Sequence, residues 1–184
     1  MIRISVTGPE STGKSWLTRR LAEHYKTRWV PEYAREYLEE INRPYTYDDI
    51  LLIAQNQFRE ENASCESTEL LFCDTDFCVT SIWCNVRYGK CHDWILTKLH
   101  QNHYGLYLLC DIDLPWEYDP LREHPDMRSK LYVMYRDLLD DQKFNYRVVS
   151  GTGEDRLQHA INFVDEYLQN LDKSAEDKYS RPLI

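Results

Sequence analysis

The residues best suited to chemistry lie near the N-terminus, where two glycines enclose four residues and a lysine and a serine follow. The spacing Gly8-x-x-x-x-Gly13-Lys14-Ser15 is that of a P-loop. In such a loop the backbone N–H groups converge on one anion, and the following helix adds the positive end of its dipole. Lys14 can reach the β- and γ-phosphates of ATP, and the Ser15 hydroxyl can ligate Mg²⁺. The pattern therefore predicts a loop that binds ATP and Mg²⁺.

The segments on either side of this loop have the character that a P-loop requires. Residues 2–6 form an apolar run with β-branched side chains, which predicts a buried strand, and residues 15–26 carry apolar residues at helical spacing. An ordinary glycine turn that happens to end in Lys-Ser is the alternative. We expect the contacts to ATP to come from the loop, the start of the helix and one later arginine: Gly8, Ser11, Thr12, Gly13, Lys14, Ser15, Trp16 and Arg128.

Carboxylates follow the second and third predicted strands. Asp74 comes directly after the apolar run 70–73, as in a Walker B strand, and is expected to hold Mg²⁺ together with Ser15. Asp76 is either a site residue or the N-cap of the next helix. Glu32 either accepts the proton of a hydroxyl acceptor or serves the dipole of the helix that follows it. Arg35, one turn further on, pairs with Glu32 or contacts phosphate.

A proline-containing loop at about 114–128 supplies candidate cations. Arg122 and Arg128 can close over the γ-phosphate and stabilise charge during transfer, and Arg87 is a further candidate. The alternative is a solvated loop with surface arginines. Glu10 is unfavourable within a phosphate-binding loop, and we expect its carboxylate to point away from the phosphates or to reach the acceptor.

Composition narrows the class of protein. The 184 residues are enough for one domain with a sizeable core, and the formal net charge of −9 argues against a general nucleic-acid binder. No stretch approaches the roughly 20 apolar residues of a membrane span, and no secretory signal precedes the first strand. The six cysteines form no Cys-x-x-Cys pair, which disfavours a zinc site. We therefore expect a cytoplasmic protein with reduced thiols.

Strand and helix patterns alternate along the chain. Strands are predicted at 2–6, 28–32, 69–76, 104–113 and 146–151, and helices at 15–26, 33–42, 47–62, 77–87, 93–102, 127–142 and 153–171. This alternation predicts an α/β fold with a parallel five-stranded sheet and helices on both faces. Ligands of such sheets bind beyond the carboxyl ends of the strands. We expect one domain over residues 1–171 and a polar, poorly ordered tail over 172–184.

Four strings together resemble a known family: "TGPESTGKS", "VPEYAREYL", "FCDTD" and "DIDLPWEYDPLR". They are similar, over roughly residues 1–170, to the ribosylnicotinamide kinase domain of a bifunctional bacterial NAD-salvage protein. The resemblance implies a P-loop NTPase of the NMP-kinase-like type. It also implies transfer of the γ-phosphate of ATP to the 5′-hydroxyl of nicotinamide riboside. The pyridinium cation of that substrate suits a rim of acids and aromatic rings.

The resemblance also assigns roles to individual residues. It implies that Lys14, Glu32, Asp74 and Arg122 are catalytic, without deciding which acid is the base. It places a further set at the acceptor side or in the lid: Glu32, Arg35, Asp76 and Trp116. The chain has no His-x-Gly-His sequence of an adenylyltransferase, so we expect a stand-alone kinase. The alternatives are a P-loop kinase for another nucleoside or small alcohol, and a regulatory module that binds nucleotide without transferring phosphate. The oligomeric state is not predicted.

Overall fold

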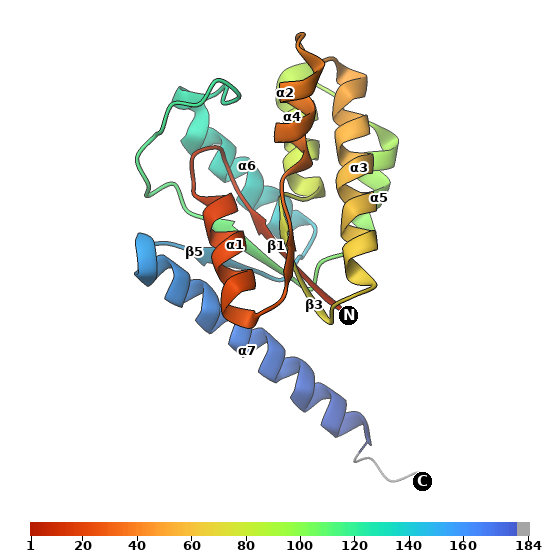
Figure 1. Cartoon of the computed structure of the whole chain (residues 1–184), viewed down its shortest axis with the longest axis vertical. Helices are drawn as coiled ribbons and strands as arrows, with labels where there is room; N and C mark the ends of the chain where they lie inside the picture. The colour runs from red at the N-terminus through yellow and green to blue at the C-terminus, as the bar shows by residue number, and fades with distance from the viewer. Residues whose placement is uncertain (180–184) are drawn as a thin grey trace.

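A parallel five-stranded sheet forms the centre of the molecule (Figure 1). The computed structural model describes residues 1–179, with side chains up to residue 173. Within these residues the strands are β1 (Ile2–Thr7), β2 (Arg28–Val30), β3 (Leu70–Asp74), β4 (Leu106–Cys110) and β5 (Tyr146–Val149). Their order across the sheet is β2-β3-β1-β4-β5, and every pair is parallel. The predicted sheet is confirmed.

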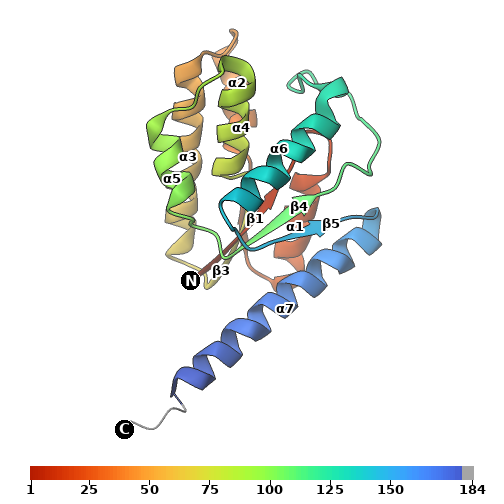
Figure 2. The ribbon, with the colours of Figure 1, turned by 180° about the vertical axis from the view of Figure 1, so that it is seen from behind.

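Helices cover both faces of this sheet, as predicted (Figures 1 and 2). They are α1 (Lys14–Tyr25), α2 (Tyr33–Ile41), α3 (Tyr47–Cys65), α4 (Phe77–Tyr88), α5 (Asp93–His100), α6 (Arg128–Asp141) and α7 (Gly153–Tyr179), with a 3₁₀ turn at Pro125–Met127. Side chains of α1 and α7 form one hydrophobic cluster with the sheet. Side chains of α3, α4, α5 and α6 form the other.

Strand β4 shows how the sequence builds these two cores. All five of its residues are buried. Leu106, Leu108 and Cys110 pack in the cluster of α1 and α7, whereas Tyr107 and Leu109 pack in the cluster on the opposite face. A strand that is covered on both faces reads as a continuous apolar run, because successive side chains alternate between the faces. Cys73 of β3 and Cys110 are buried packing residues as predicted, and all six cysteines are free thiols.

Helix α7 is longer than the sequence predicts. Its apolar residues pack in the cluster with the sheet as far as Leu168, and the helix then extends away from the rest of the molecule to Tyr179 (Figures 1 and 2). We predicted its end at residue 171, where the apolar spacing stops. It continues because no glycine or proline interrupts residues 154–179. The rest of the predicted tail, 180–184, lies outside the described residues. None of the described helices is long and apolar enough to span a bilayer.

The topology fixes where a ligand can bind. Strand β1 lies between β3 and β4: after β1 the chain passes to β2 on one side, and after β3 it passes to β4 on the other side of β1. At such a switch point the loops beyond the carboxyl ends of the strands separate and leave a crevice. The P-loop follows β1, and Asp74 ends β3. The sheet order therefore brings the P-loop and Asp74 together at the carboxyl ends of the neighbouring strands β1 and β3.

A buried acid lies near the amino ends of the strands, where it contacts Arg3 at the start of β1 and Tyr104 just before β4. Glu61 of α3 is fully buried, and both its carboxylate oxygens accept from the Tyr104 hydroxyl at 3.0 Å. Gln57 donates to it at 3.5 Å, and Arg3 Nη1 lies 3.6 Å away. Burial raises the pKa of Glu61 from 4.5 to about 7 in spite of these partners. The folded protein therefore holds this proton at a pH where the unfolded chain has released it.

This proton makes stability depend on pH. Between pH 4.5 and about 7 the folded state binds more protons than the unfolded state, so the contribution of Glu61 to stability falls as pH rises. Glu61→Gln, a neutral isostere, removes that dependence. We expect the free energy of unfolding of the variant, relative to wild type, to rise by roughly 3 kcal/mol across this window. Denaturant unfolding of both proteins through the window measures it, and parallel stability curves would contradict the assignment.

Candidate active site

The P-loop is held in a conformation that requires its two glycines. Gly8 has φ 131°, and a Cβ there would lie 3.0 Å from the carbonyl oxygen of Cys110. Gly13 has φ 76°, and a Cβ would lie 3.0 Å from the side chain of Leu114. Lys14 Nζ donates to the carbonyl of Pro9 at 2.9 Å. The loop therefore curls tightly between β1 and α1, which confirms the predicted strand–loop–helix arrangement.

A cavity of about 630 Å³ opens beside this loop. It is within the size range of small-molecule sites. Its walls come from the P-loop, α2, α4, α6 and the segment between β4 and α6. Ten of the residues selected from the sequence line it: Gly8, Ser11, Thr12, Gly13, Lys14, Ser15, Trp16, Glu32, Arg35 and Arg122. Asp74, Asp76, Trp116 and Arg128 are absent from its lining, each for an identifiable reason.

Asp74 lies directly beneath the cavity. Asp74 is only 1% exposed, and the neighbouring Ser15 side chain acts to lower the pKa of its carboxyl. Its Oδ1 atom has no hydrogen-bond partner among the described residues. Burial, followed by the negative charge of Glu32, raises the pKa of Asp74 to about 7. A buried carboxylate oxygen without a partner is costly, so a cation bound there would stabilise it.

Mg²⁺ fits this pair of residues chemically. A carboxylate and a hydroxyl supply the oxygen ligands that this ion prefers, and Mg²⁺ is commonly held by one or two carboxylates together with substrate phosphates. No group of three or more His, Cys, Asp and Glu side chains in the described part of the chain could hold a metal by itself. An ion at Asp74 and Ser15 would therefore need phosphate oxygens from a nucleotide to complete its coordination.

Asp76 is used by the fold. Its Oδ1 accepts from the backbone N–H groups of Cys78 and Val79 at 2.8 and 3.0 Å, so it is the N-cap of α4. Its Oδ2 accepts from the Ser5 hydroxyl at 2.5 Å. The carboxylate is buried and does not reach the cavity. Of the two roles that the sequence left open, the structure favours the helix cap, because all these donors lie on the sheet and helix side of Asp76.

Glu32, unlike Asp76, does not cap the helix that follows it. It occupies the N-cap position of α2 but makes no capping hydrogen bond with its side chain. It lines the cavity instead. Arg35, one turn into α2, also lines the cavity and donates to Asp119 at 2.8 Å. That ion pair joins α2 to the segment after β4, so Arg35 pairs with Asp119 where the sequence had suggested Glu32.

The segment 114–128, which we call the lid, lies over the P-loop. Arg122 Nη1 donates to the Ser11 hydroxyl at 3.3 Å and also to the carbonyl of Glu117. Its guanidinium lies 6.0 Å from the ring centroid of Trp116. Trp116 therefore supports Arg122 from behind without lining the cavity itself.

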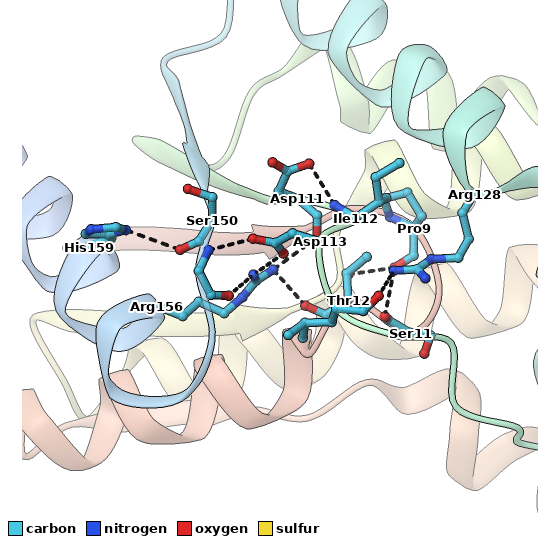
Figure 3. Close-up of polar contacts among 12 residues, drawn as sticks. Pro9, Ser11, Thr12, Asp111, Ile112, Asp113, Arg128, Ser150, Arg156 and His159 are labelled. Carbon is cyan, nitrogen blue, oxygen red and sulfur yellow. Dashed lines mark hydrogen bonds and ion pairs between the residues drawn. The ribbon is translucent and has the colours of Figure 1, made fainter.

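Two further side chains, Arg128 and Glu10, attach the lid to the P-loop. Arg128 donates to the carbonyls of Ser11 and Leu114 at 3.1 and 2.8 Å, so its guanidinium is spent on the backbone away from the cavity (Figure 3). The carboxylate of Glu10 accepts from the backbone N–H groups of Glu123 and His124 at 3.2 and 3.1 Å. The P-loop carboxylate that seemed unfavourable among phosphates is therefore turned towards the lid.

Arg156, a buried cation that contacts the P-loop, was not among the site residues predicted from the sequence. This residue is 1% exposed and pairs with Asp113 at 2.7 Å (Figure 3). Its guanidinium also donates to the carbonyls of Thr12, Asp111 and Gly151 at 3.0, 3.1 and 2.8 Å. One side chain thus ties together the P-loop, the end of β4 and the loop before α7. A signal existed: Arg156 lies four residues before Ala160, on the buried stripe of α7.

Replacement of Arg156 tests this role. Arg156→Lys keeps the charge but loses the planar fork that reaches a carboxylate and three carbonyls together. We expect the P-loop to be held less firmly and ATP affinity to fall about tenfold. Isothermal titration with ATP measures the change, with Arg147→Lys, an arginine on β5 that is 42% exposed, as the matched control. Equal affinities for Arg156→Lys and the control would remove Arg156 from the binding machinery.

Comparison with known proteins agrees with this geometry. A family model described as "AAA domain" matches residues 3–156. The Trifunctional NAD biosynthesis/regulator protein NadR of Escherichia coli (strain K12) is 25% identical over 174 residues, which are 90% of this chain and 42% of that protein. The NadR of Salmonella typhimurium (strain LT2) is 28% identical over 125 residues, or 65% of this chain and 30% of that protein. The chain thus spans less than half the length of these relatives.

Solved structures show the same fold. A NadR protein crystallised in complex with NR has a TM-score of 0.77 at 23% identity, over 90% of this chain and 49% of that one. Thymidylate kinase from Ehrlichia chaffeensis has a TM-score of 0.65 at 13% identity, over 91% of this chain and 98% of that one. These matches confirm the P-loop kinase fold and the family resemblance seen in the sequence. The chain belongs to the AAA domain family and is homologous to part of the NadR proteins.

Proposed function

We propose that this protein is an ATP-dependent kinase that phosphorylates the 5′-hydroxyl of nicotinamide riboside and so produces nicotinamide mononucleotide. One observation carries the proposal: a single cavity connects the P-loop with Glu32 and Arg35 on the far side. A phosphate donor at the loop and a hydroxyl acceptor beside Glu32 would therefore share one enclosed space. Proximity of this kind is the main requirement of phosphoryl transfer.

The part of the cavity away from the P-loop supports a flat, cationic acceptor. Trp83 of α4 and Tyr45 line it, with ring centroids 5.0 Å apart in an edge-to-face arrangement. The Tyr45 hydroxyl donates to Glu123 at 2.7 Å, and Glu123 also lines the cavity. Aromatic faces and carboxylates both attract a positively charged ring such as pyridinium. A homologous NadR protein has been solved in complex with NR, and another structure contains NAD and AMP-PNP, which supports the same assignment.

Each group in the cavity has a role in such a transfer. Lys14 and Arg122 would neutralise charge on the transferred phosphoryl group, and Glu32 would accept the proton of the attacking hydroxyl. Arg35 and its partner Asp119 would keep α2 and the lid together over the reacting groups. Mg²⁺, when held by Ser15 and Asp74, would screen the negative charge of the phosphates. The lid backbone, attached through Glu10, would exclude water.

A second candidate is a P-loop kinase for another nucleoside. It is favoured by the likeness to thymidylate kinase and to a deoxyadenosine kinase from M. mycoides, the latter with a TM-score of 0.63. Those similarities are at 13% and 10% identity and extend to the fold alone. The carboxylate-bearing acceptor pocket favours a cationic base over the neutral bases of those substrates. A non-catalytic nucleotide-binding module is the third possibility.

Product formation distinguishes these functions. Incubation with ATP, Mg²⁺ and nicotinamide riboside should give the mononucleotide, detected by chromatography, faster than thymidine or deoxyadenosine is phosphorylated. Lys14→Ala should lower kcat by roughly 10²–10³-fold, because it removes a charge aimed at the transferred group. Lys130→Ala, on the exposed side of α6, is the matched control and should not change the rate. Preference for thymidine or deoxyadenosine would favour the second candidate, and transfer to no acceptor would favour the binding module.

Arg122 should act on the transition state more than on ATP binding. It reaches the cavity from the lid, where charge builds up during transfer. We expect Arg122→Ala to lower kcat by at least about tenfold while the dissociation constant of ATP changes less. Single-turnover kinetics and calorimetry separate the two quantities, with the exposed Arg136→Ala of α6 as the control. Equal losses in both quantities would place Arg122 in ground-state binding.

A further inference from the structure

Thr75, the residue after Asp74, has a backbone conformation that is unfavourable for its type. Its φ is 90°, in the region that favours glycine, although threonine is β-branched. It is 3% exposed, and its N–H donates to the carbonyl of Val6 at 3.3 Å. Strained residues of this kind persist where the surrounding structure holds them, and they concentrate at functional sites. The observation raises the question of what the Thr75 side chain contacts.

The Thr75 hydroxyl donates to Oε1 of Glu32 at 3.3 Å. The sheet register explains this contact. Val30 of β2 lies opposite Cys73 of β3, and both strands are parallel, so the residues two positions further along each chain meet just beyond the sheet. Those residues are Glu32 and Thr75. Register thus places a hydroxyl donor beside a carboxylate that lines the cavity.

A second contact leaves the Glu32 carboxylate available for this hydroxyl. An acid at the N-cap of a helix ordinarily accepts from the helix's own N–H groups. In α2 the first N–H, that of Tyr33, donates instead to Gln57 Oε1 of α3 at 2.8 Å. Gln57 is buried, so the contact is shielded from water. Gln57 of α3 thus satisfies the first N–H of α2, while the Glu32 side chain makes no capping bond and lines the cavity.

The Glu32 carboxylate lies near the carboxylate of Asp74 and therefore needs a contact that fixes its position. Asp74 and Glu32 follow adjacent strands and repel each other when both are ionised. Without an anchor, the Glu32 side chain would be expected to rotate away from Asp74 and from the acceptor. Thr75 can supply that anchor, since it follows Asp74 directly in the chain and its hydroxyl donates to Glu32.

We propose that Thr75 is a positioning residue, whose hydroxyl orients the Glu32 carboxylate towards the acceptor hydroxyl. The inference rests on the proposed kinase function, in which Glu32 accepts the acceptor's proton. It adds that the strained turn after β3 serves this orientation, and that Thr75 acts only through Glu32. Removal of the hydroxyl should therefore affect the chemical step and leave ATP binding unchanged.

Thr75→Val tests this directly, because valine has nearly the same shape and lacks the hydroxyl. We expect kcat for nicotinamide riboside to fall about tenfold, with an unchanged dissociation constant for ATP. Thr75→Ser, which keeps the hydroxyl, should recover kcat to within about threefold of wild type. Thr80→Val is the matched control, since Thr80 is equally buried and its hydroxyl contacts only helix carbonyls, those of Asp76 and Phe77. It should leave kcat unchanged.

A double-mutant cycle shows whether Thr75 acts through Glu32. In a Glu32→Gln background, Thr75→Val should cause no further loss of kcat, because the group that it orients is already gone. Should the valine variant fold poorly, as judged by its thermal unfolding, Thr75→Gly removes the hydroxyl in a residue that accepts φ 90° and should show the same loss.

The outcomes separate the two hypotheses. Absence of the mononucleotide product with wild-type protein would contradict the proposed function. Product formation by wild type together with an undiminished kcat in Thr75→Val would overturn the role of Thr75 alone. Full additivity of Thr75→Val and Glu32→Gln would also overturn it, since the hydroxyl would then act independently of the carboxylate.

Discussion

Binding a polyanion to a chain of net charge −9 is the constraint on which the rest of the structure depends. Long-range attraction cannot supply the affinity, so positive groups must be concentrated at one point. The backbone N–H groups of the P-loop and the end of α1 supply partial charges that cost no side chain. Lys14 and Arg122 add full charges at the cavity, and Arg156 adds one beneath the loop. Two of the acids that line the same cavity, Glu10 and Glu123, accept hydrogen bonds from lid backbone groups and from Tyr45.

The state of the carboxylates around the cavity is decided by competition for hydrogen-bond donors. The carboxylate of Asp76 accepts hydrogen bonds from α4 and Ser5, and that of Glu10 accepts from the lid backbone. Asp113 forms an ion pair with Arg156. Asp74 retains an oxygen without a partner among the described residues, and the Glu32 side chain makes no capping hydrogen bond to α2. Asp74 is buried, so its unpaired oxygen is costly until a ligand contacts it, whereas the half-buried Glu32 can contact a ligand from the cavity wall.

The lid illustrates how one segment can serve binding and positioning together. Ser11 of the P-loop contacts the lid through its hydroxyl, which accepts from Arg122, and through its carbonyl, which accepts from Arg128. Arg35 of α2 reaches the same segment at Asp119. The P-loop, the lid and α2 are therefore connected by hydrogen bonds. A change at any one of these three elements would be transmitted to the other two through contacts that are few and identifiable.

The sequence alone determined the P-loop, the five strands and their helices, the family resemblance and ten of the residues that line the cavity, because each depends on spacing within a short segment. Only the tertiary structure decided that Asp76 caps α4 while Glu32 faces the cavity, that Glu10 binds the lid, and that Arg156 supports the loop. Apart from the local cap of α4, these outcomes rest on donors and acceptors supplied by segments far apart in the chain, and such pairings leave no periodic pattern in the sequence. In the sequence, an acid that follows a strand has the same pattern whether it caps the next helix or faces the cavity. The donors that lie near it in the folded structure decide between the two roles.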